Sequence, residues 1–471
     1  MWTQAQIHEI VQKQRDFFLS GQTLDIPWRK EQLNKLKTAI LRFEPELEAA
    51  MAEDLGRSRT EAYFCDIGST ILEINEALRH LSKWARPETH FSGLVNFPSL
   101  ITKVYKLPYG NTLIISPFNF PVLLSLGVLT ASMAGGNTAV IKTSSKAVQT
   151  TRVLQKLIEE TFPPEYVTVV GGGHAEADLC LSERFDKIFY TGSPKVGRHV
   201  LEMAAQNLTP VALELGGENG NWCVIRKDAD LRDAARKIAF FKLCNSGQVC
   251  ININQVAVAE KVAREFLRLL QEEFRRQIGK DALRHPEYPH LISDDAYEKC
   301  AWEAEQYRER ILCGGYGNPE TRQYAPTIIY PVSPEEDIVM HELFSPLLPV
   351  VPFKEEKIND LLQLIARREH PLAMYLFTSD KAWAKKVFSS SQYGGGCVNE
   401  VCQHLMVKGV PFNGTGHSGM GAYHGEWGFR EFTHPSTVMF GKTRGNLPLR
   451  EHPYRDKSGE WKLQLIRWFE R

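Results

Sequence analysis

Apolar residues recur at helical spacing throughout the first 90 residues of the chain. They form three groups: Ile7, Ile10 and Val11, then Leu33, Leu36 and Ile40, and later Ile71, Ile74, Leu78 and Leu81. Residues three and four positions apart share one face of a helix, so each group marks a face that packs on a core. The N-terminal region is therefore expected to be helical.

Short β-prone runs come next, with helical or turn-rich segments between them. They cover residues 112–115, 139–141, 167–170 and 187–190. Strands that alternate with helices predict a parallel sheet covered by helices.

A second alternating region begins near Leu213 and predicts another α/β unit. Its helical patterns and apolar runs cover residues 229–243, 256–258, 260–278 and 349–351. The segments 100–105 and 436–440 read as exposed strands that belong to neither core. Because exposed strand edges tend to be paired or covered, these two segments are candidates for a subunit interface.

The composition is that of a globular protein with a large core. Of its 471 residues 43% are hydrophobic and 24% charged, and 56 basic residues balance 56 acidic ones. A chain with no net charge creates no strong field to recruit nucleic acid or an anionic membrane. We therefore expect a small-molecule partner and no nucleic acid.

Cysteine usage and the start of the chain predict a cytoplasmic protein. Nine cysteines are scattered without framework spacing, and no basic-then-apolar leader is visible at the start. The uncharged stretch between Lys106 and Lys142 is interrupted by prolines and glycines. This stretch is expected to form buried strands and a helix, with no transmembrane span.

The first candidate for chemistry is Cys250, which ends the string NSGQVC directly after a helical pattern. A nucleophilic cysteine needs an accessible, polar setting that stabilises its thiolate, and such a turn provides one. Cys250 alone is weak evidence, because a single cysteine is more often a small buried apolar residue.

Two upstream segments strengthen the case for Cys250. Glu214 stands between apolar residues before paired glycines, where partial desolvation raises its pKa towards a value useful for a general base. Asn119 lies in a stiff loop between Pro117 and Pro121, which could direct an amide N–H at a developing oxyanion.

These three segments, in this order, resemble the signature regions of the aldehyde dehydrogenase superfamily. The resemblance continues through the strings AGGNTAVIK at 134–142, YTGSPKVG at 190–197, ELFSP at 342–346 and PFNGTG at 411–416. The strings TGSPKVG, NSGQVC and HSGMGAYHG are most similar to the class-three-like branch, which includes fatty and aromatic aldehyde dehydrogenases and is typically dimeric.

The resemblance implies an α/β aldehyde dehydrogenase fold with three parts and a tail. A Rossmann-like NAD(P)-binding domain would comprise 1–97 and 109–213, an α/β catalytic domain 214–413, a small β oligomerisation element 98–108 and 432–446, and the C-terminal tail 447–471. The tail is too short and too charged to span a bilayer, so packing on a homodimer is expected.

The resemblance also implies NAD(P)-dependent oxidation of a medium- or long-chain aliphatic or aromatic aldehyde to the carboxylic acid. Cys250 would form a thiohemiacetal and then a thioester, and Glu214 would activate the hydrolytic water. Asn119 and the Cys250 backbone N–H would stabilise the oxyanion.

For the cofactor, NAD or NADP, the strand at 187–190 runs into Thr191, Gly192 and Ser193 and a helix start that can face a pyrophosphate. The remaining roles are implied by resemblance: Lys142 and Glu342 at the riboses, Phe344 at the nicotinamide and Pro117 nearby. No GxGxxG string supports this domain, since Gly171–Gly173 is read as a loop. Ser145 replaces a glutamate that often repels a 2′-phosphate, so NADP is expected to be accepted beside NAD.

Three departures put local loop geometry in doubt. Glu218 and Gly220 stand where the family commonly has lysine and proline, and Ser345 replaces a glycine. The segment between Glu214 and Cys250 is also about two residues longer than usual, which makes the approach of this pair less certain.

Alternative functions and sites remain open. A CoA-acylating dehydrogenase or acyl-CoA reductase would pass the thioester to CoA, although Glu214 favours hydrolysis, and a non-catalytic NAD(P)-binding protein would be expected to lack the reacting residues. No metal is expected, because Cys397, Cys402 and His404 lack standard zinc spacing. Cys244 could form a regulatory disulfide with Cys250, but a helix-buried thiol is favoured.

Overall fold

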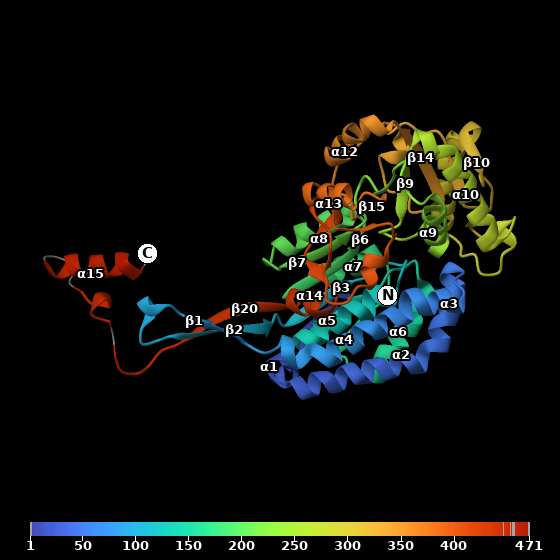
Figure 1. The fold of residues 1–471 in the computed structure, drawn as a ribbon. Coiled ribbons are helices and arrows are strands. Elements are labelled where there is room, and N and C mark those ends of the chain that lie inside the picture. The colour runs from blue at the N-terminus through green and yellow to red at the C-terminus, as the bar shows by residue number, and fades with distance from the viewer. Residues whose placement is uncertain (1, 446, 453, 455–456, 470–471) are drawn as a thin grey trace.

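Two α/β lobes pack against each other, and a strand arm extends away from them (Figure 1). The computed structural model describes residues 2–445, 447–452, 454 and 457–469. Parallel sheets with helices on their faces confirm the α/β class predicted from the alternating pattern.

The N-terminal region is helical, as the apolar spacing predicts. Its helices are α1 (Gln4–Leu19), α2 (Ile26–Leu55), α3 (Arg59–Ala62) and α4 (Gly68–Trp84), with the π-helical turn η2 (Tyr63–Ile67) before α4. The Asp25 side chain caps α2 by accepting a hydrogen bond from the Trp28 N–H. Leu33, Leu36 and Ile40 are fully buried on one side of α2.

The first lobe is built on a six-stranded sheet with the order β18-β7-β6-β3-β4-β5. The strands are β3 (Asn111–Ile115), β4 (Thr138–Lys142), β5 (Val167–Val170), β6 (Lys187–Gly192), β7 (Val211–Leu215) and β18 (Gly419–Met420). All pairs are parallel except β18 with β7. The four strands predicted between residues 112 and 190 are confirmed.

Helices cover both faces of this sheet, because neighbouring strand residues point to opposite sides. Leu113 packs in one cluster with residues of α1 and α8, whereas Ile114 packs in another with residues of α2 and α6. The helices of this lobe after α4 are α5 (Val128–Gly135), α6 (Val148–Thr161), α7 (His174–Leu181), α8 (Pro194–Ala205) and α14 (Gly425–Glu431).

The second lobe holds a seven-stranded sheet with the order β10-β13-β14-β9-β8-β15-β16, parallel apart from β10. Its strands are β8 (Asn221–Ile225), β9 (Ile253–Ala259), β10 (Ile311–Cys313), β13 (Thr327–Ile329), β14 (Leu347–Phe353), β15 (Ala373–Phe377) and β16 (Gly395–Val398). Its helices are α9 (Leu231–Leu243), α10 (Glu260–Ile278), α11 (Asp294–Gln306), α12 (Ile358–Ala366) and α13 (Lys381–Ser390). Two short ladders pair β11 (Gly317–Asn318) with β12 (Gln323–Tyr324) and β17 (Phe412–Asn413) with β19 (Ala422–Tyr423).

The strand arm consists of β1 (Glu88–Phe91), β2 (Ile101–Pro108) and β20 (Thr433–Phe440), paired antiparallel in the order β1-β2-β20. It projects from the first lobe, and α15 (Lys457–Phe469) lies near its far end (Figure 1). The two exposed strands predicted near residues 100 and 436 therefore pair with each other. Phe91, Ile101 and Met439 are exposed on this arm, and its role as a subunit interface stays a prediction.

A search of the described ranges found no helix that is both long and apolar enough to cross a membrane. The uncharged stretch before Lys142 instead forms β3, α5 and β4, which are buried in the first lobe, as predicted.

Candidate active site

The turn that carries Cys250 is strained and deeply packed. Helix α9 ends at Leu243, and the 3₁₀ turn η5 (Cys244–Gly247) follows it. Asn245 and Ser246 both have positive φ, 49° and 53°, a conformation that costs about 1–2 kcal/mol for each non-glycine residue. The next residue, Gly247, is also left-handed, and a Cβ there would come within 2.2 Å of the Ser345 carbonyl oxygen. Surrounding contacts must therefore hold this turn in place.

One of these contacts is Arg57, whose fully buried guanidinium joins three separate segments. It donates to the Asp66 carboxylate at 2.8 Å, to the Asn245 side-chain oxygen at 3.1 Å and to the Asn119 carbonyl oxygen. Asn245 also donates its side-chain amide to the Asn119 carbonyl at 3.1 Å. This network ties the Asn119 loop to the turn before Cys250.

The predicted site residues gather around one cavity at the ends of β6 and β7, here called the strand-end cavity. Its lining consists of Pro117, Phe118, Asn119, Thr191, Gly192, Ser193, Glu214, Gly216, Cys250, Glu342 and Phe344. Every residue predicted for catalysis or cofactor binding is in this set except Lys142. Lys142 ends β4, and its ammonium donates to the carbonyl oxygens of Thr143 and Gly172, both at 2.6 Å.

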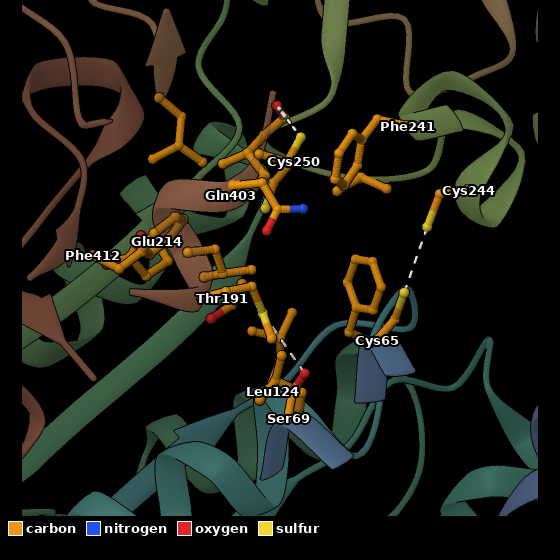
Figure 2. Close-up of a pocket in the computed structure, with 18 of the residues that line it drawn as sticks. Cys65, Ser69, Leu124, Thr191, Glu214, Phe241, Cys244, Cys250, Gln403 and Phe412 are labelled. Carbon is orange, nitrogen blue, oxygen red and sulfur yellow. Dashed lines mark hydrogen bonds between the residues drawn. The ribbon is translucent and has the colours of Figure 1, made fainter. Parts of the chain in front are cut away.

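Cys250 also lines a second cavity on its other side, here called the apolar cavity (Figure 2). The two cavities share Thr191, Glu214 and Cys250. The other residues of the apolar cavity are Phe64, Cys65, Ser69, Phe120, Leu123, Leu124, Phe241, Cys244, Val249, Ile251, Leu372, Cys402, Gln403, Leu405, Met406, Phe412 and Tyr423. Cys250 therefore forms part of the wall of both cavities.

Burial disfavours the ionised forms of the Cys250 thiol and the Glu214 carboxyl. It raises the pKa of Cys250 to about 12, and the carboxyls of Glu342 and Glu214 contribute to that shift. Burial likewise raises the pKa of Glu214 well above its usual range, with a smaller contribution from the Glu431 carboxyl. Neither carboxyl oxygen of Glu214 has a hydrogen-bond partner among the described residues, so both are available to a water or a substrate.

Asn119 is held so that one amide proton stays available. Its Nδ2 donates to the Gln248 carbonyl oxygen at 3.2 Å. A side-chain amide carries two N–H donors, and its second donor can serve an oxyanion beside Cys250.

The end of β6 leads straight into a helix, as the sequence predicts. Ser193 caps α8, its hydroxyl accepting a hydrogen bond from the Val196 N–H at 3.4 Å. A Cβ at Gly192 would come within 2.2 Å of the Tyr190 hydroxyl, so any other residue at this turn would have to displace the Tyr190 ring. Gly192 and Ser193 line the strand-end cavity at the N-terminus of α8, where the helix dipole favours an anion.

Glu342 and Phe344 approach the strand-end cavity from the second lobe. One Glu342 carboxyl oxygen is buried without a partner among the described residues, and burial raises the pKa of Glu342 to about 8. A Cβ at Gly216 would come within 2.2 Å of this carboxyl, so that glycine makes room for it. Phe344 contacts Phe118 edge to face, with ring centroids 5.9 Å apart.

The departures at Glu218, Gly220 and Ser345 are accommodated locally. Glu218 pairs with Arg198 at 2.6 Å and with His417 at 2.8 Å. Gly220 has a φ of 61°, which proline cannot adopt. The longer segment after Glu214 does not separate it from Cys250, since both line the same two cavities.

The cysteines outside the site are all free thiols. Cys244 is buried, as predicted, although it lies in the turn after α9 and not within a helix. Its sulfur lies 3.6 Å from that of Cys65, a neighbour that the sequence did not suggest. Cys397 and His404 approach to 3.5 Å, and no cluster of three or more metal-binding side chains occurs in the described part of the chain.

Comparison with known proteins agrees with this geometry. A model of the Aldehyde dehydrogenase family matches residues 1–438. The chain belongs to this family. Among curated aldehyde dehydrogenases, 4,4'-diaponeurosporen-aldehyde dehydrogenase of Staphylococcus aureus is 35% identical over 443 residues, which cover 94% of this chain and 95% of that protein.

A second relative, aldehyde dehydrogenase family 3 member H1 of Arabidopsis thaliana, is 32% identical over 466 residues and covers 98% of this chain and 94% of its own length. Among solved aldehyde dehydrogenase structures, the substrate-bound state of Staphylococcus aureus AldH superimposes with a TM-score of 0.94 at 33% identity, covering 99% of both chains. The predicted resemblance to the class-three-like branch is confirmed, because a family 3 member is among these relatives.

Proposed function

We propose that this aldehyde dehydrogenase oxidises long-chain apolar aldehydes to carboxylic acids through a thioester on Cys250, with NAD or NADP as cofactor. The observation that carries the proposal is the position of Cys250 and Glu214 at the junction of the two cavities. One cavity suits an apolar aldehyde and the other suits a dinucleotide, so both can reach the same sulfur.

The strand-end cavity fits a nicotinamide dinucleotide. Gly192 and Ser193 line this cavity at the N-terminus of α8, and the positive end of the helix dipole there favours a pyrophosphate. The buried oxygen of Glu342 without a partner is placed for a ribose hydroxyl, and Phe344 for the nicotinamide side. When bound, the cofactor supplies the hydride acceptor.

Lys142 and Ser145 support the choice between NAD and NADP, which differ by a 2′-phosphate on one ribose. The Lys142 ammonium lies beside Gly172, and Ser145 is an exposed hydroxyl where a glutamate would repel a 2′-phosphate. Because no carboxylate occupies position 145, we propose that both NAD and NADP bind.

The residues of the chain divide the reaction between them. The Cys250 thiol loses its proton to water, and its sulfur bonds to the aldehyde carbon as the C=O double bond opens to an oxyanion. The Asn119 amide proton that has no partner among the described residues and the Cys250 backbone N–H stabilise this oxyanion. After oxidation of this thiohemiacetal, Glu214 takes a proton from the water that attacks the thioester. Its oxygens have no partner in the described part of the chain, which leaves room for that water.

The apolar cavity supports a long apolar tail as the substrate class. Among the described residues that line this cavity, Glu214 is the only Asp, Glu, Lys, Arg or His. Aliphatic and aromatic side chains such as Leu124, Phe241 and Phe412 form most of the cavity wall. A charged substrate would lose its hydration there without gaining an ion pair. An aliphatic or aromatic tail would instead gain by leaving water.

The test is to follow reduced nicotinamide with decanal and NAD or NADP, with and without CoA, for wild type and Cys250→Ala. We expect CoA-independent turnover that the alanine variant lacks. A strict need for CoA would establish the acylating reaction instead. Cofactor binding without turnover of any aldehyde would favour a non-catalytic member of the fold.

A further inference from the structure

A pair of thiols lies beside the reacting cysteine. Cys65 is in η2 and Cys244 is in η5, and their sulfur atoms are 3.6 Å apart (Figure 2). Both are free thiols. They come from positions 179 residues apart in the sequence, so folding alone brings them together.

This pair also borders a cavity outside the catalytic junction, with Cys65 as its partly exposed member. A separate cavity, here called the outer cavity, shares Phe64, Cys65 and Cys244 with the apolar cavity. Its other lining residues are Ser58, Thr60, Glu61, Phe240, Leu243, Gln277, Ile278, His285, Glu287, Tyr288 and Pro289. The two thiols therefore form part of the wall between both cavities, whereas Cys180 and Cys223 are buried in the cores.

We propose that Cys65 and Cys244 form a redox modification site that a hydroperoxide converts to a disulfide, and that this disulfide lowers aldehyde turnover. Cys65 is the partly exposed partner and meets the oxidant first, while the buried Cys244 resolves the product. The hydrogen bond to Cys65, burial and Glu61 raise the pKa of Cys244, which disfavours its thiolate and therefore its direct attack on the oxidant.

The reaction balances with hydrogen peroxide as the oxidant. The Cys65 sulfur, losing its proton, attacks one peroxide oxygen, the O–O bond breaks, and a sulfenic acid and one water form. The Cys244 sulfur then attacks the sulfenic sulfur, an S–S bond replaces the S–O bond, and a second water leaves. The Cys244 thiol donates to Glu61 Oε1 at 3.7 Å, which gives its proton an acceptor. Two thiols supply the two electrons that reduce the peroxide.

Disulfide formation would move η5, the turn before Cys250. A disulfide has an S–S length of about 2.05 Å, so the sulfurs must approach by about 1.5 Å from 3.6 Å. Cys244 is followed directly by Asn245, whose N–H donates to Glu61 at 2.6 Å and whose side chain holds the Asn119 and Gln248 carbonyls. Displacing this turn by about 1 Å would disturb both the oxyanion donor and the nucleophile, with an expected loss of at least about tenfold in turnover.

The first experiment requires no activity. Cys250→Ala protein is treated with equimolar hydrogen peroxide, and its intact mass and its peptides are analysed without reductant. We expect loss of the mass of two hydrogens and a peptide that joins Cys65 to Cys244. A Cys244 peptide linked to any other cysteine, or no linked peptide, would overturn the proposal.

The second experiment measures turnover before and after the same treatment, with each protein compared with its own untreated activity. Wild type and Cys313→Ser, which removes a partly exposed thiol on β10, are expected to lose activity that dithiothreitol restores. Cys65→Ser and Cys244→Ser are expected to resist this reversible loss. If both of these variants reversibly lose as much activity as wild type, the pair is not the switch. If wild type shows no turnover before oxidation, that result counts against the proposed function alone.

Discussion

The Arg57 guanidinium and the Asp66 carboxylate form an ion pair at 2.8 Å in which neither side chain has any exposed surface. Asp66 also accepts hydrogen bonds from the backbone N–H groups of Val122 and Leu123, at 3.0 and 2.5 Å. The pair thus connects η2 to the segment after Asn119, while the remaining Arg57 donors hold Asn119 and Asn245. A buried charge pair therefore fixes the loop and the turn that face Cys250.

Asp66→Asn is expected to destabilise the protein strongly. The change removes the nearer of two carboxylates beside the buried Arg57 charge and leaves only Glu61, 3.7 Å from the Arg57 Nε. Removing one partner of a buried pair costs about 3–5 kcal/mol. Urea unfolding followed by tryptophan fluorescence measures the effect. Lys35→Gln is the control, because Lys35 and its partner Glu31 are both exposed on α2, and the unfolding midpoint should stay unchanged. Similar unfolding midpoints for the two variants would contradict a stabilising role of the buried Arg57–Asp66 pair.

Glu214→Gln is expected to stop the reaction after the thioester has formed. Without the carboxylate, water attack slows by about 10²-fold or more, while Cys250 can still react. Rapid mixing should show one equivalent of reduced nicotinamide followed by little turnover, and mass spectrometry should find the acyl group on Cys250.

Glu218→Gln provides the matched control for this carboxylate. Glu218 follows the same strand but pairs with Arg198 and His417 outside the site, so its variant should turn over repeatedly. Loss of the initial burst in Glu214→Gln would mean that Glu214 acts before the thioester.

The Cys250 thiol is expected to become more reactive as pH rises. Because burial raises its pKa to about 12, only a small fraction is thiolate near neutrality, and that fraction grows about tenfold per pH unit below the pKa. Alkylation by iodoacetamide in the absence of cofactor, read at the Cys250 peptide, should keep accelerating from pH 7 to 10. A plateau at or below the ordinary thiol pKa of about 8.5 would refute this expectation.

Catalytic efficiency is expected to increase with the length of the aldehyde tail. Each buried methylene contributes about 0.8 kcal/mol, which corresponds to about fourfold in kcat/KM while the tail remains inside the apolar cavity. A series from propanal to decanal measures the slope. Met406→Glu, at a partly exposed part of the cavity wall, should lower the values for decanal more than those for propanal. A flat series would rule out the long-tail assignment.

Local patterns in the sequence predicted most of the fold. Runs such as 139–141 and 187–190 are buried β4 and β6, because alternation of apolar strands with helices is typical of a covered parallel sheet. The proposed reacting residues Asn119, Glu214 and Cys250 were chosen because each stands in a short, recognisable string, and their roles stay a prediction. Their common cavity supports that prediction.

The supporting residues could not be predicted in the same way. Arg57 and Asn245 are 188 positions apart, and nothing in their local sequence signals a contact between them. The Cys65–Cys244 approach has the same origin, because it depends on how η2 packs beside η5. The left-handed pair Asn245–Ser246 was read only as a turn, since its backbone conformation depends on these distant contacts.

The short strand β18 places Gly419 opposite Glu214 and covers the edge of β7. A Cβ at Gly419 would come within 2.1 Å of the Leu213 carbonyl oxygen, so the two backbones meet closely there. During synthesis, the edge of β7 therefore stays unpaired until residues about 200 positions further along the chain have been made. At usual ribosomal rates this takes about 10–40 s. Until then the strand that bears Glu214 is an open edge on which a nascent-chain chaperone could bind, and the site can close only after residue 419 has been made.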